Sequence, residues 1–187
     1  MRPVLVFATA LLLATGTLLT SGPVSAQPQP QLSRQERNFV MEALAGSLAE
    51  RAMGKRAQDR AESPAVRRFA QRLVDDQGLI GDRLIGLAQR HGIPIPREAD
   101  STTRAHMASL NEVSEASFDR RYMAASEEMK ARAIKLYSAQ ADREGETADF
   151  ARDTLPTLRT HFDEAGRVLG ELARAAQRVE PGAGLSQ

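Results

Sequence analysis

Cysteine and tryptophan are absent from this 187-residue sequence. Without cysteine the chain can form no disulfide bond and no thiolate metal site, and it has neither a cysteine nucleophile nor a cysteine for lipid attachment after signal cleavage. Aromatic residues make up only 4% of the chain, so a core must be built from Leu, Ala, Val, Ile and Met. This composition favours an all-α fold over a β-sandwich.

An excess of charge of either sign is also absent. The whole chain carries a formal charge of +1, and residues 1–26 contain one base, Arg2, and no acid, so the remainder is neutral with 24 bases and 24 acids. A neutral chain gives no electrostatic reason to bind nucleic acid. Its length suits a single domain.

The motifs of common enzyme classes are missing as well. A ferritin-type di-iron site needs two Glu-x-x-His pairs, in which Glu and His lie one turn apart on the same helix face. The residues three positions before His91, His106 and His161 are Ala88, Thr103 and Leu158. The sequence also has no Gly-x-Gly-x-x-Gly, no phosphate-binding loop and no Gly-x-Ser-x-Gly. We therefore expect no enzyme activity and predict no cofactor.

Residues 1–26 have the pattern of a cleaved secretory signal. A basic residue precedes an apolar run over 4–19, and Val24-Ser25-Ala26 fits the small-x-small pattern of a signal-peptidase site, with cleavage after Ala26. A membrane anchor is the alternative, because the run of about 16 residues approaches the roughly 20 that span a bilayer. Gly22-Pro23 and the polar Pro/Gln linker at 27–32 favour cleavage. We expect a periplasmic or cell-envelope protein with no membrane-spanning segment after cleavage.

Capping signals predict the first two helices. Ser33-Arg34-Gln35-Glu36 has the capping-box form, in which Ser and Glu each bond the other's backbone N–H, and the apolar periodicity continues to near Arg60. Ser63-Pro64 repeats the start signal, with Pro at the first helical position. The second helix is expected to end at His91, because the following glycine can adopt the left-handed conformation of a helix end.

Two further helices are expected after a long polar connection over 97–114, in which a weak apolar pair allows a short helix. The third long apolar stripe covers 118–145, and the fourth covers 150–176. Pro156 interrupts the fourth stripe and is expected to kink or restart that helix.

Four long helices, with the longest connection between the second and third, describe an antiparallel four-helix bundle of ferritin-like topology. The pattern places this bundle at 33–178, after the linker at 27–32. The tail at 179–187 is expected to be disordered.

Each expected helix carries one polar residue in phase with its apolar stripe: Glu50, Gln77, Lys130 and His161. Burial of a polar group without a partner is costly. One interpretation places these residues at stripe edges, or singly in the core with local partners. The sharper one is a buried polar cluster in which Lys130 neutralises Glu50 while Gln77 and His161 complete the hydrogen bonds, an arrangement that specifies packing more than catalysis.

A metal site is the alternative use of such a core. Glu50, Asp76 and His161 are its candidate ligands, since carboxylate oxygen and imidazole nitrogen bind common divalent ions. A cation at Lys130 opposes this alternative.

A basic stretch lies between residues 51 and 72. It contains seven bases against the two acids Asp59 and Glu62. The seven bases are Arg51, Lys55, Arg56, Arg60, Arg67, Arg68 and Arg72. An ordinary solvated face explains them, and a surface for anionic envelope polymers or lipid head groups is the alternative.

Five motifs occur in order along the chain. They are Phe39-Val40 with Ala45-Gly46 and Glu50, Val66-x-x-Phe69-Ala70-x-x-Leu73-Val74-x-Asp76, Gly92-Ile93-x-Ile95-Pro96, Phe118-Asp119-Arg120-x-Tyr122-Met123, and Thr154-Leu155-Pro156-Thr157-Leu158-x-x-His161. Over about residues 36–172 the sequence resembles the exported bacterial ferritin-like proteins of the domain-of-unknown-function family four-one-four-two.

The resemblance implies a helical, ferritin-like fold in the periplasm or outer envelope, often labelled a predicted outer-membrane protein, with no established activity. Such proteins typically carry Asp-His in the second helix and again in the third. This sequence has Asp76-Gln77 and Met129-Lys130 at those positions. Both histidines are replaced, so a metal role is in doubt for this chain.

Together these features predict an exported envelope protein, a non-enzymatic helical bundle that acts as a binding or structural module. One alternative is a metal-binding or oxidative-stress protein that uses the bundle core. Another is an adaptor that binds anionic envelope polymers through the basic stretch. The partners expected for the protein are an envelope polymer or another protein.

Overall fold

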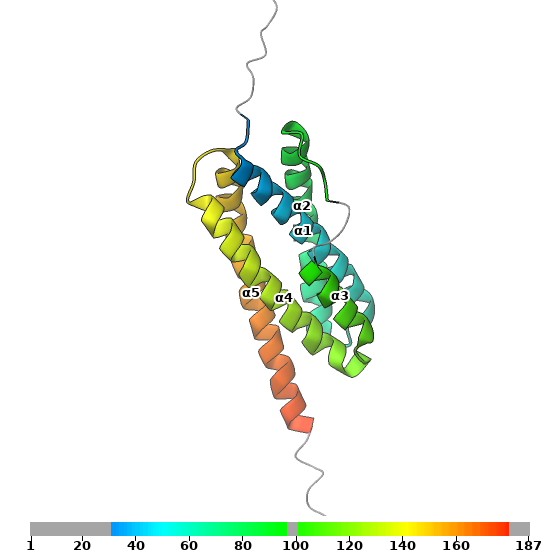
Figure 1. Cartoon of the computed structure of the whole chain (residues 1–187). Coiled ribbons are helices and arrows are strands. Elements are labelled where there is room, and N and C mark those ends of the chain that lie inside the picture. Colours follow the sequence, from blue (N-terminus) through cyan, green and yellow to red (C-terminus); the bar gives the residue numbers. More distant parts are fainter. Residues whose placement is uncertain (1–30, 97–100, 180–187) are drawn as a thin grey trace, which may run out of the picture. The chain divides into compact units, whose positions relative to one another are not determined.

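The computed structural model describes residues 31–96 and 101–179, which form five α-helices and no strand (Figure 1). The helices are α1 (Arg34–Arg60), α2 (Pro64–Arg90), α3 (Ser101–Glu112), α4 (Glu115–Ala141) and α5 (Glu146–Val179). The all-helical prediction is confirmed. The expected signal peptide at 1–26, most of the linker at 27–32 and nearly all of the tail at 179–187 lie outside the described residues.

The starts of α1 and α2 follow the capping signals. The backbone N–H of Ser33 donates to a Glu36 carboxylate oxygen at 2.8 Å, and the N–H of Glu36 donates to Ser33 Oγ at 3.3 Å. The hydrogen bond from Ser33 lowers the pKa of Glu36. At α2, Ser63 Oγ accepts from the N–H of Ala65, and Pro64 is the first helical residue. After α2, Gly92 adopts φ +59°, as its place after the last turn requires.

The later helices differ in detail from the periodicity. The connection after α2 contains the short helix α3, and α4 ends at Ala141, four residues before Gly145. Gly145 turns with φ +95° before α5 begins. Pro156 lies inside α5, which continues through it as one helix, so proline does not restart the helix as one expectation had it. Val179, the first residue of the expected tail, is the last residue of α5.

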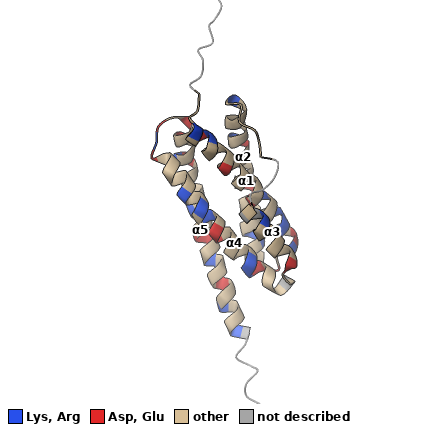
Figure 2. Cartoon of the chain, viewed as in Figure 1, with Lys and Arg blue, Asp and Glu red and all other residues tan. Residues whose placement is uncertain are grey.

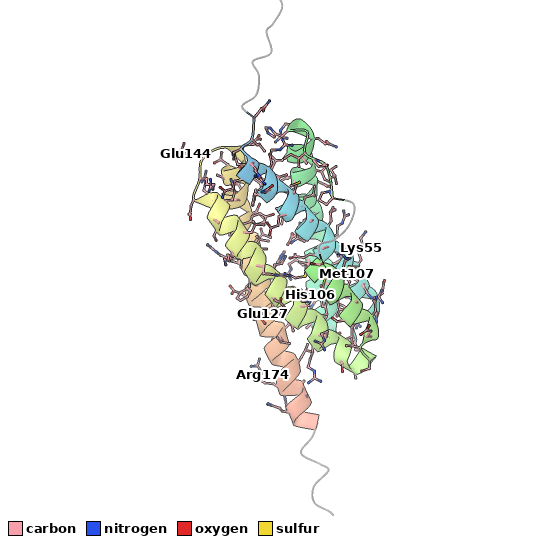
Figure 3. The ribbon with its side chains drawn as sticks, in the orientation of Figure 1. Lys55, His106, Met107, Glu127, Glu144 and Arg174 are labelled. Atoms are coloured by element: carbon pink, nitrogen blue, oxygen red, sulfur yellow. The ribbon has the colours of Figure 1, made fainter. Side chains whose placement is uncertain are left out.

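The helices pack as two hairpins. α1 lies along α2 and α4 along α5, while α1 also contacts α4, α2 contacts α5, and α3 packs on α4 and α1 (Figure 1). Met107 of α3 packs against the core, and His106 beside it reaches to 3.7 Å from a Glu128 oxygen of α4 (Figure 3).

Two apolar clusters fill the interior. One surrounds Phe69, Phe118 and Tyr122, and we call it the Phe69 cluster. The other surrounds Phe39 and its aromatic neighbours on α4 and α5, and we call it the Phe39 cluster. Burial of this apolar surface is the main favourable term in folding.

A polar layer separates the two clusters. On α2, Gln77 lies between the last residue of the Phe69 cluster and the first of the Phe39 cluster, and Lys130 on α4 and His161 on α5 hold the same place. On α1, Ser47 lies at the boundary and Glu50 one helical turn further on. The same level of the structure therefore collects one buried polar group or more from each long helix.

Candidate functional site

An ion pair lies in the middle of the polar layer. Lys130 Nζ donates to Glu50 Oε2, and Gln77 Nε2 donates to the same oxygen at 2.6 Å. Ser47 Oγ supports Gln77 by donating to its backbone carbonyl at 2.9 Å. Lys130 is 0% exposed, Glu50 5% and Gln77 3%. The structure thus brings three of the four sequence-selected polar residues together, from three different helices.

The fourth residue, His161, has a different partner from the expected one. Its Nε2 atom lies 2.8 Å from Asp76 Oδ2, and it makes no hydrogen bond to Glu50 or Lys130. The ring is 1% exposed, and its Nδ1 atom has no hydrogen-bond partner among the described residues. Asp76 precedes Gln77 on α2, so adjacent side chains of α2 serve two different pairs.

Burial and neighbouring charges decide the ionisation of this layer. Burial lowers the pKa of Lys130, and Glu50 opposes that shift. For His161, burial and the positive charge of Lys130 lower the pKa, and the hydrogen bond with Asp76 opposes them. At neutral pH His161 is therefore a neutral imidazole beside the Asp76 carboxylate.

The shift at His161 has a consequence for stability. The unfolded chain takes up the histidine proton near pH 6.5, while the folded chain takes it up only at lower pH, so stability falls as pH is lowered from 7 through about 6.5. We expect His161→Gln to show a smaller loss over pH 7 to 5 than the parent, in urea melts at each pH. His106→Gln, on α3, is the matched control for histidine replacement, because it leaves the contact between His161 and Asp76 intact. Identical slopes for parent and His161→Gln would contradict this assignment.

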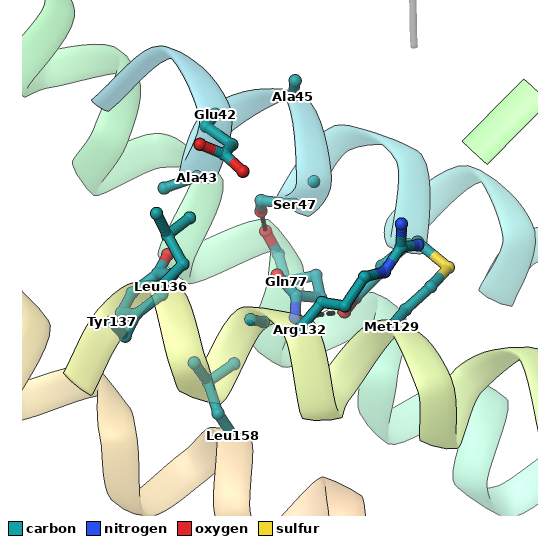
Figure 4. A pocket seen from close by; sticks show the side chains of 13 residues that line it. Glu42, Ala43, Ala45, Ser47, Gln77, Met129, Arg132, Leu136, Tyr137 and Leu158 are labelled. Carbon is teal, nitrogen blue, oxygen red and sulfur yellow. Dashed lines mark hydrogen bonds between the residues drawn. The ribbon is translucent and has the colours of Figure 1, made fainter. Parts of the chain in front are cut away.

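A pocket of about 390 Å³ opens between α1 and α4, above the ion pair. Figure 4 shows Ala43 and Ser47 of α1 on one side, Tyr137 of α4 on the other, Gln77 behind them and Leu158 of α5 below Tyr137 in the view. The remaining lining residues are Glu42, Ala45, Gly46, Glu50, Met129, Arg132, Ala133 and Leu136. The lining of the pocket is therefore mainly apolar. The polar side chains Glu50 and Gln77 form the part that we call its floor.

Gly46 makes room for this pocket. A Cβ atom placed there would meet no atom within 4 Å. Glycine inside a helix costs about 1 kcal/mol relative to alanine, and its place on the apolar stripe of α1 is the one sequence signal that points to this pocket. Sequence reasoning did not identify Glu42, Arg132 or Tyr137 as lining residues, because no local pattern marks them.

The candidate metal ligands are only partly brought together. Asp76 and His161 are in contact, whereas Glu50 is hydrogen-bonded to Gln77 and Lys130. Over 31–96 and 101–179, no group of three or more His, Asp or Glu side chains is placed to hold a metal ion. Any ion would also lie near the Lys130 ammonium group.

The basic stretch is divided between surface and structural roles. Lys55, Arg56 and Arg68 are exposed and form no ion pair with another described residue. Arg72 pairs with Glu164 at 2.7 Å, and Arg67 donates to the carbonyl of Ala61. Arg51 is half-buried, and its guanidinium lies against α2 near Gly78.

Arg60 is the member whose role sequence reasoning missed. It donates to the carbonyls of Leu110 and Val113, at 2.5 and 3.0 Å, and its guanidinium lies 4.5 Å from the centre of the Phe118 ring. Figure 2 shows basic and acidic residues interspersed along the helices. The seven bases therefore do not form one continuous basic surface, because some of them are bound within the fold.

Comparison with known proteins places the chain in a family. The family model described as Domain of unknown function (DUF4142) matches residues 21–168. The chain belongs to this family. None of the curated proteins matches this DUF4142 chain.

A solved structure shares the fold. The crystal structure of a DUF305 fragment from Deinococcus radiodurans superposes with a TM-score of 0.69, at 19% sequence identity, over 76% of this DUF4142 chain and 99% of that one. At this level of identity the likeness concerns the fold alone. No helix in the described part of the chain is long and apolar enough to cross a membrane.

Proposed function

We propose that this DUF4142 protein is an exported, non-enzymatic binding module with a ferritin-like four-helix core, and that its ligand enters the pocket between α1 and α4. The observation that carries the proposal is the pocket itself. It is about 390 Å³ in volume, with apolar walls and with Glu50 and Gln77 on its floor. Ligand sites typically occupy about 300–1,000 Å³ and combine apolar walls with a few convergent polar groups.

The ion pair supports a binding role over a catalytic one. Glu50 Oε2 accepts from both Lys130 and Gln77, so the buried carboxylate and the buried ammonium group are paired with each other. Such a pair fixes which helix faces meet, because either charge alone would be costly in the interior. The pocket is thereby built over a rigid polar floor.

The apolar run and cleavage pattern in residues 1–26 support export. A ferritin-like core is supported by two long hairpins joined through the connection that contains α3.

The two alternatives have weaker support. A metal role would rest on Asp76 and His161, whose Nδ1 atom is unpaired among the described residues, and Lys130 opposes a cation there. An adaptor role would rest on the three exposed bases of the basic stretch that have no described ion-pair partner, since Arg60, Arg67 and Arg72 are bound within the fold.

The neutral dye N-phenyl-1-naphthylamine tests the pocket. We expect its fluorescence to rise on titration with the mature protein, because the dye brightens in apolar surroundings. In Gly46→Leu the new side chain occupies the free space, and we expect affinity to fall at least about tenfold, or about 1.4 kcal/mol. Leucine also favours helix over glycine, so the variant should fold.

Gly170→Leu is the matched control. Gly170 lies in α5 away from the pocket, where a Cβ atom would meet only the flexible Arg174 guanidinium, at 3.8 Å. We expect this variant to bind the dye as the parent does. A dye affinity unaffected by Gly46→Leu, or no dye binding at all, would contradict the proposed function.

A further inference from the structure

We propose that the pocket takes a small organic cation, a primary ammonium group carried on an apolar chain of several carbons. The inference rests on the proposed function, since it names the ligand class of the same pocket. Three features of the site carry it: the carboxylate that faces the pocket, the free acceptor atoms, and the shape of the walls.

The charges around the floor balance one another. The opposite charges of Glu50 and Lys130 neutralise each other, so the pair contributes no net charge. At this level Asp76, beside a neutral His161, contributes a negative charge, and half-buried Arg51, beside Gly78, contributes a positive one. At the rim the exposed Glu42 and Arg132 have opposite signs and cancel. These groups therefore sum to no net charge, and only the placement of Glu50 can favour one sign of ligand over the other.

The position of Glu50 discriminates against an anion. Glu50 lines the pocket, whereas Lys130 does not, so an entering ligand meets the carboxylate before the ammonium. Glu50 Oε2 is occupied by two donors, but Oε1 takes no hydrogen bond from a described residue. A ligand carboxylate here would face another carboxylate, whereas a ligand ammonium would gain a charge-assisted hydrogen bond.

Tyr137 supplies a second polar atom that a ligand can reach from the pocket. Its side chain is 3% exposed and lines the pocket, yet its hydroxyl forms no hydrogen bond with a described residue. Burial raises the pKa of this hydroxyl, so it stays neutral and can accept a hydrogen bond. An ammonium group has three donors and no acceptor, which suits the acceptors Glu50 Oε1, Gln77 Oε1 of the side-chain amide and Tyr137 Oη.

The walls suit an apolar chain on that ammonium. Ala43, Met129, Ala133, Leu136 and Leu158 surround the space above the floor. The α1 wall is open at Gly46, where a Cβ atom would meet no atom within 4 Å. An unbranched chain would cover these apolar atoms while its ammonium reached the floor.

Three six-carbon compounds with different head groups test the inference. n-Hexylammonium, 1-hexanol and hexanoate are titrated by calorimetry into the mature protein at pH 7 and low salt. We expect n-hexylammonium to bind about tenfold more tightly than 1-hexanol, because one charge-assisted hydrogen bond is worth roughly 1.4 kcal/mol more than a neutral one. Hexanoate should bind most weakly, and Gly46→Leu should abolish binding of all three.

Two exposed rim variants probe the charge without disturbing the core. Glu42→Gln should weaken n-hexylammonium about two- to threefold, and Arg132→Gln should strengthen it by a similar factor, because rim charges act through solvent. Neither should change the affinity for 1-hexanol. The double variant Glu50→Gln/Lys130→Met removes the carboxylate that faces the pocket without leaving a charge unpaired, and it should reduce n-hexylammonium to the affinity of 1-hexanol.

The outcomes separate the two proposals. If 1-hexanol or hexanoate binds as well as n-hexylammonium, and Gly46→Leu abolishes that binding, the cation inference is overturned and the pocket remains a binding site. If none of the three compounds binds and the naphthylamine dye does not bind either, both proposals are overturned. Opposite effects of the two rim variants on n-hexylammonium alone would support the inference.

Discussion

Glu50→Leu is expected to lower the free energy of unfolding by about 3–5 kcal/mol, the usual cost of removing one partner of a buried ion pair. The variant leaves Lys130 Nζ, in a side chain that is 0% exposed, without its carboxylate. Gln77 Nε2 loses its acceptor at the same time. Urea unfolding at pH 7, followed by far-ultraviolet circular dichroism, measures the loss as a lower midpoint at constant slope.

Removing both charges should be far less harmful than removing one. In Glu50→Leu/Lys130→Met neither ion is buried alone, and apolar side chains of similar size extend the two apolar clusters toward each other. We expect stability within about 2 kcal/mol of the parent, and therefore a coupling energy of several kcal/mol between the two positions. Lys55→Met, on the exposed side of α1, is the control for lysine removal and should change stability by no more than about 0.5 kcal/mol.

Equal losses for Glu50→Leu and for the double variant would contradict the role assigned to the pair. They would mean that Glu50 stabilises the core through contacts other than Lys130. The double variant could also be stable with its helices packed differently. Altered near-ultraviolet circular dichroism of Tyr122 and Tyr137, which lie in different apolar clusters, would reveal that outcome.

The helices of this chain could be predicted because their signals are local. The capping box at Ser33 and Glu36, and the Ser63-Pro64 start, act within one turn, and both helices begin where those residues stand. Periodicity alone located α4 less well. No capping hydrogen bond forms at Ser114, and the end of the helix at Ala141 has no sequence marker.

The burial of Glu50, Gln77 and Lys130 also follows from the sequence, because each lies in phase with an apolar stripe. Their pairing follows less directly. Asp76 and Gln77 are neighbours on α2, about 100° apart around the axis, and phase does not say which of them meets His161. That choice depends on how α2 and α5 are rotated against each other, which is set by the whole core.

The pocket lay beyond sequence reasoning for a similar reason. Its volume depends on how closely α1 and α4 approach each other. Gly46 is the one feature of a single helix that indicates open space there. Arg60 shows the same limit. It is one of seven bases in a run, and nothing in the run distinguishes a base that binds backbone carbonyls from one that faces solvent.

Arg60→Ala is expected to cost about 2–4 kcal/mol, which makes it the most damaging change in the basic stretch. Its guanidinium makes two hydrogen bonds to carbonyls near the end of α3, and hydrogen bonds of charged groups contribute about 1.5–3 kcal/mol each. The Leu110 residue is 0% exposed, so water cannot readily replace the lost donor. Contact with the Phe118 ring at 4.5 Å adds a cation–π contribution of about 0.5–2 kcal/mol. Arg60 itself is only half-buried, so solvent offsets part of these contributions and the expected net loss is about 2–4 kcal/mol.

The loss should be concentrated around α3, because Arg60 joins α1 to the connection that follows α3. Native-state hydrogen exchange is therefore the decisive measurement: we expect faster exchange at the amides of α3 in Arg60→Ala, with α2 and α5 close to the parent. Arg60→Lys should recover only part of the stability, since an ammonium cannot reproduce the planar two-carbonyl contact. Arg56→Ala removes an exposed base from the same helix and should change neither quantity. If Arg60→Ala behaves like Arg56→Ala, the short helix is held by its apolar residues, Met107 and Leu110, rather than by Arg60.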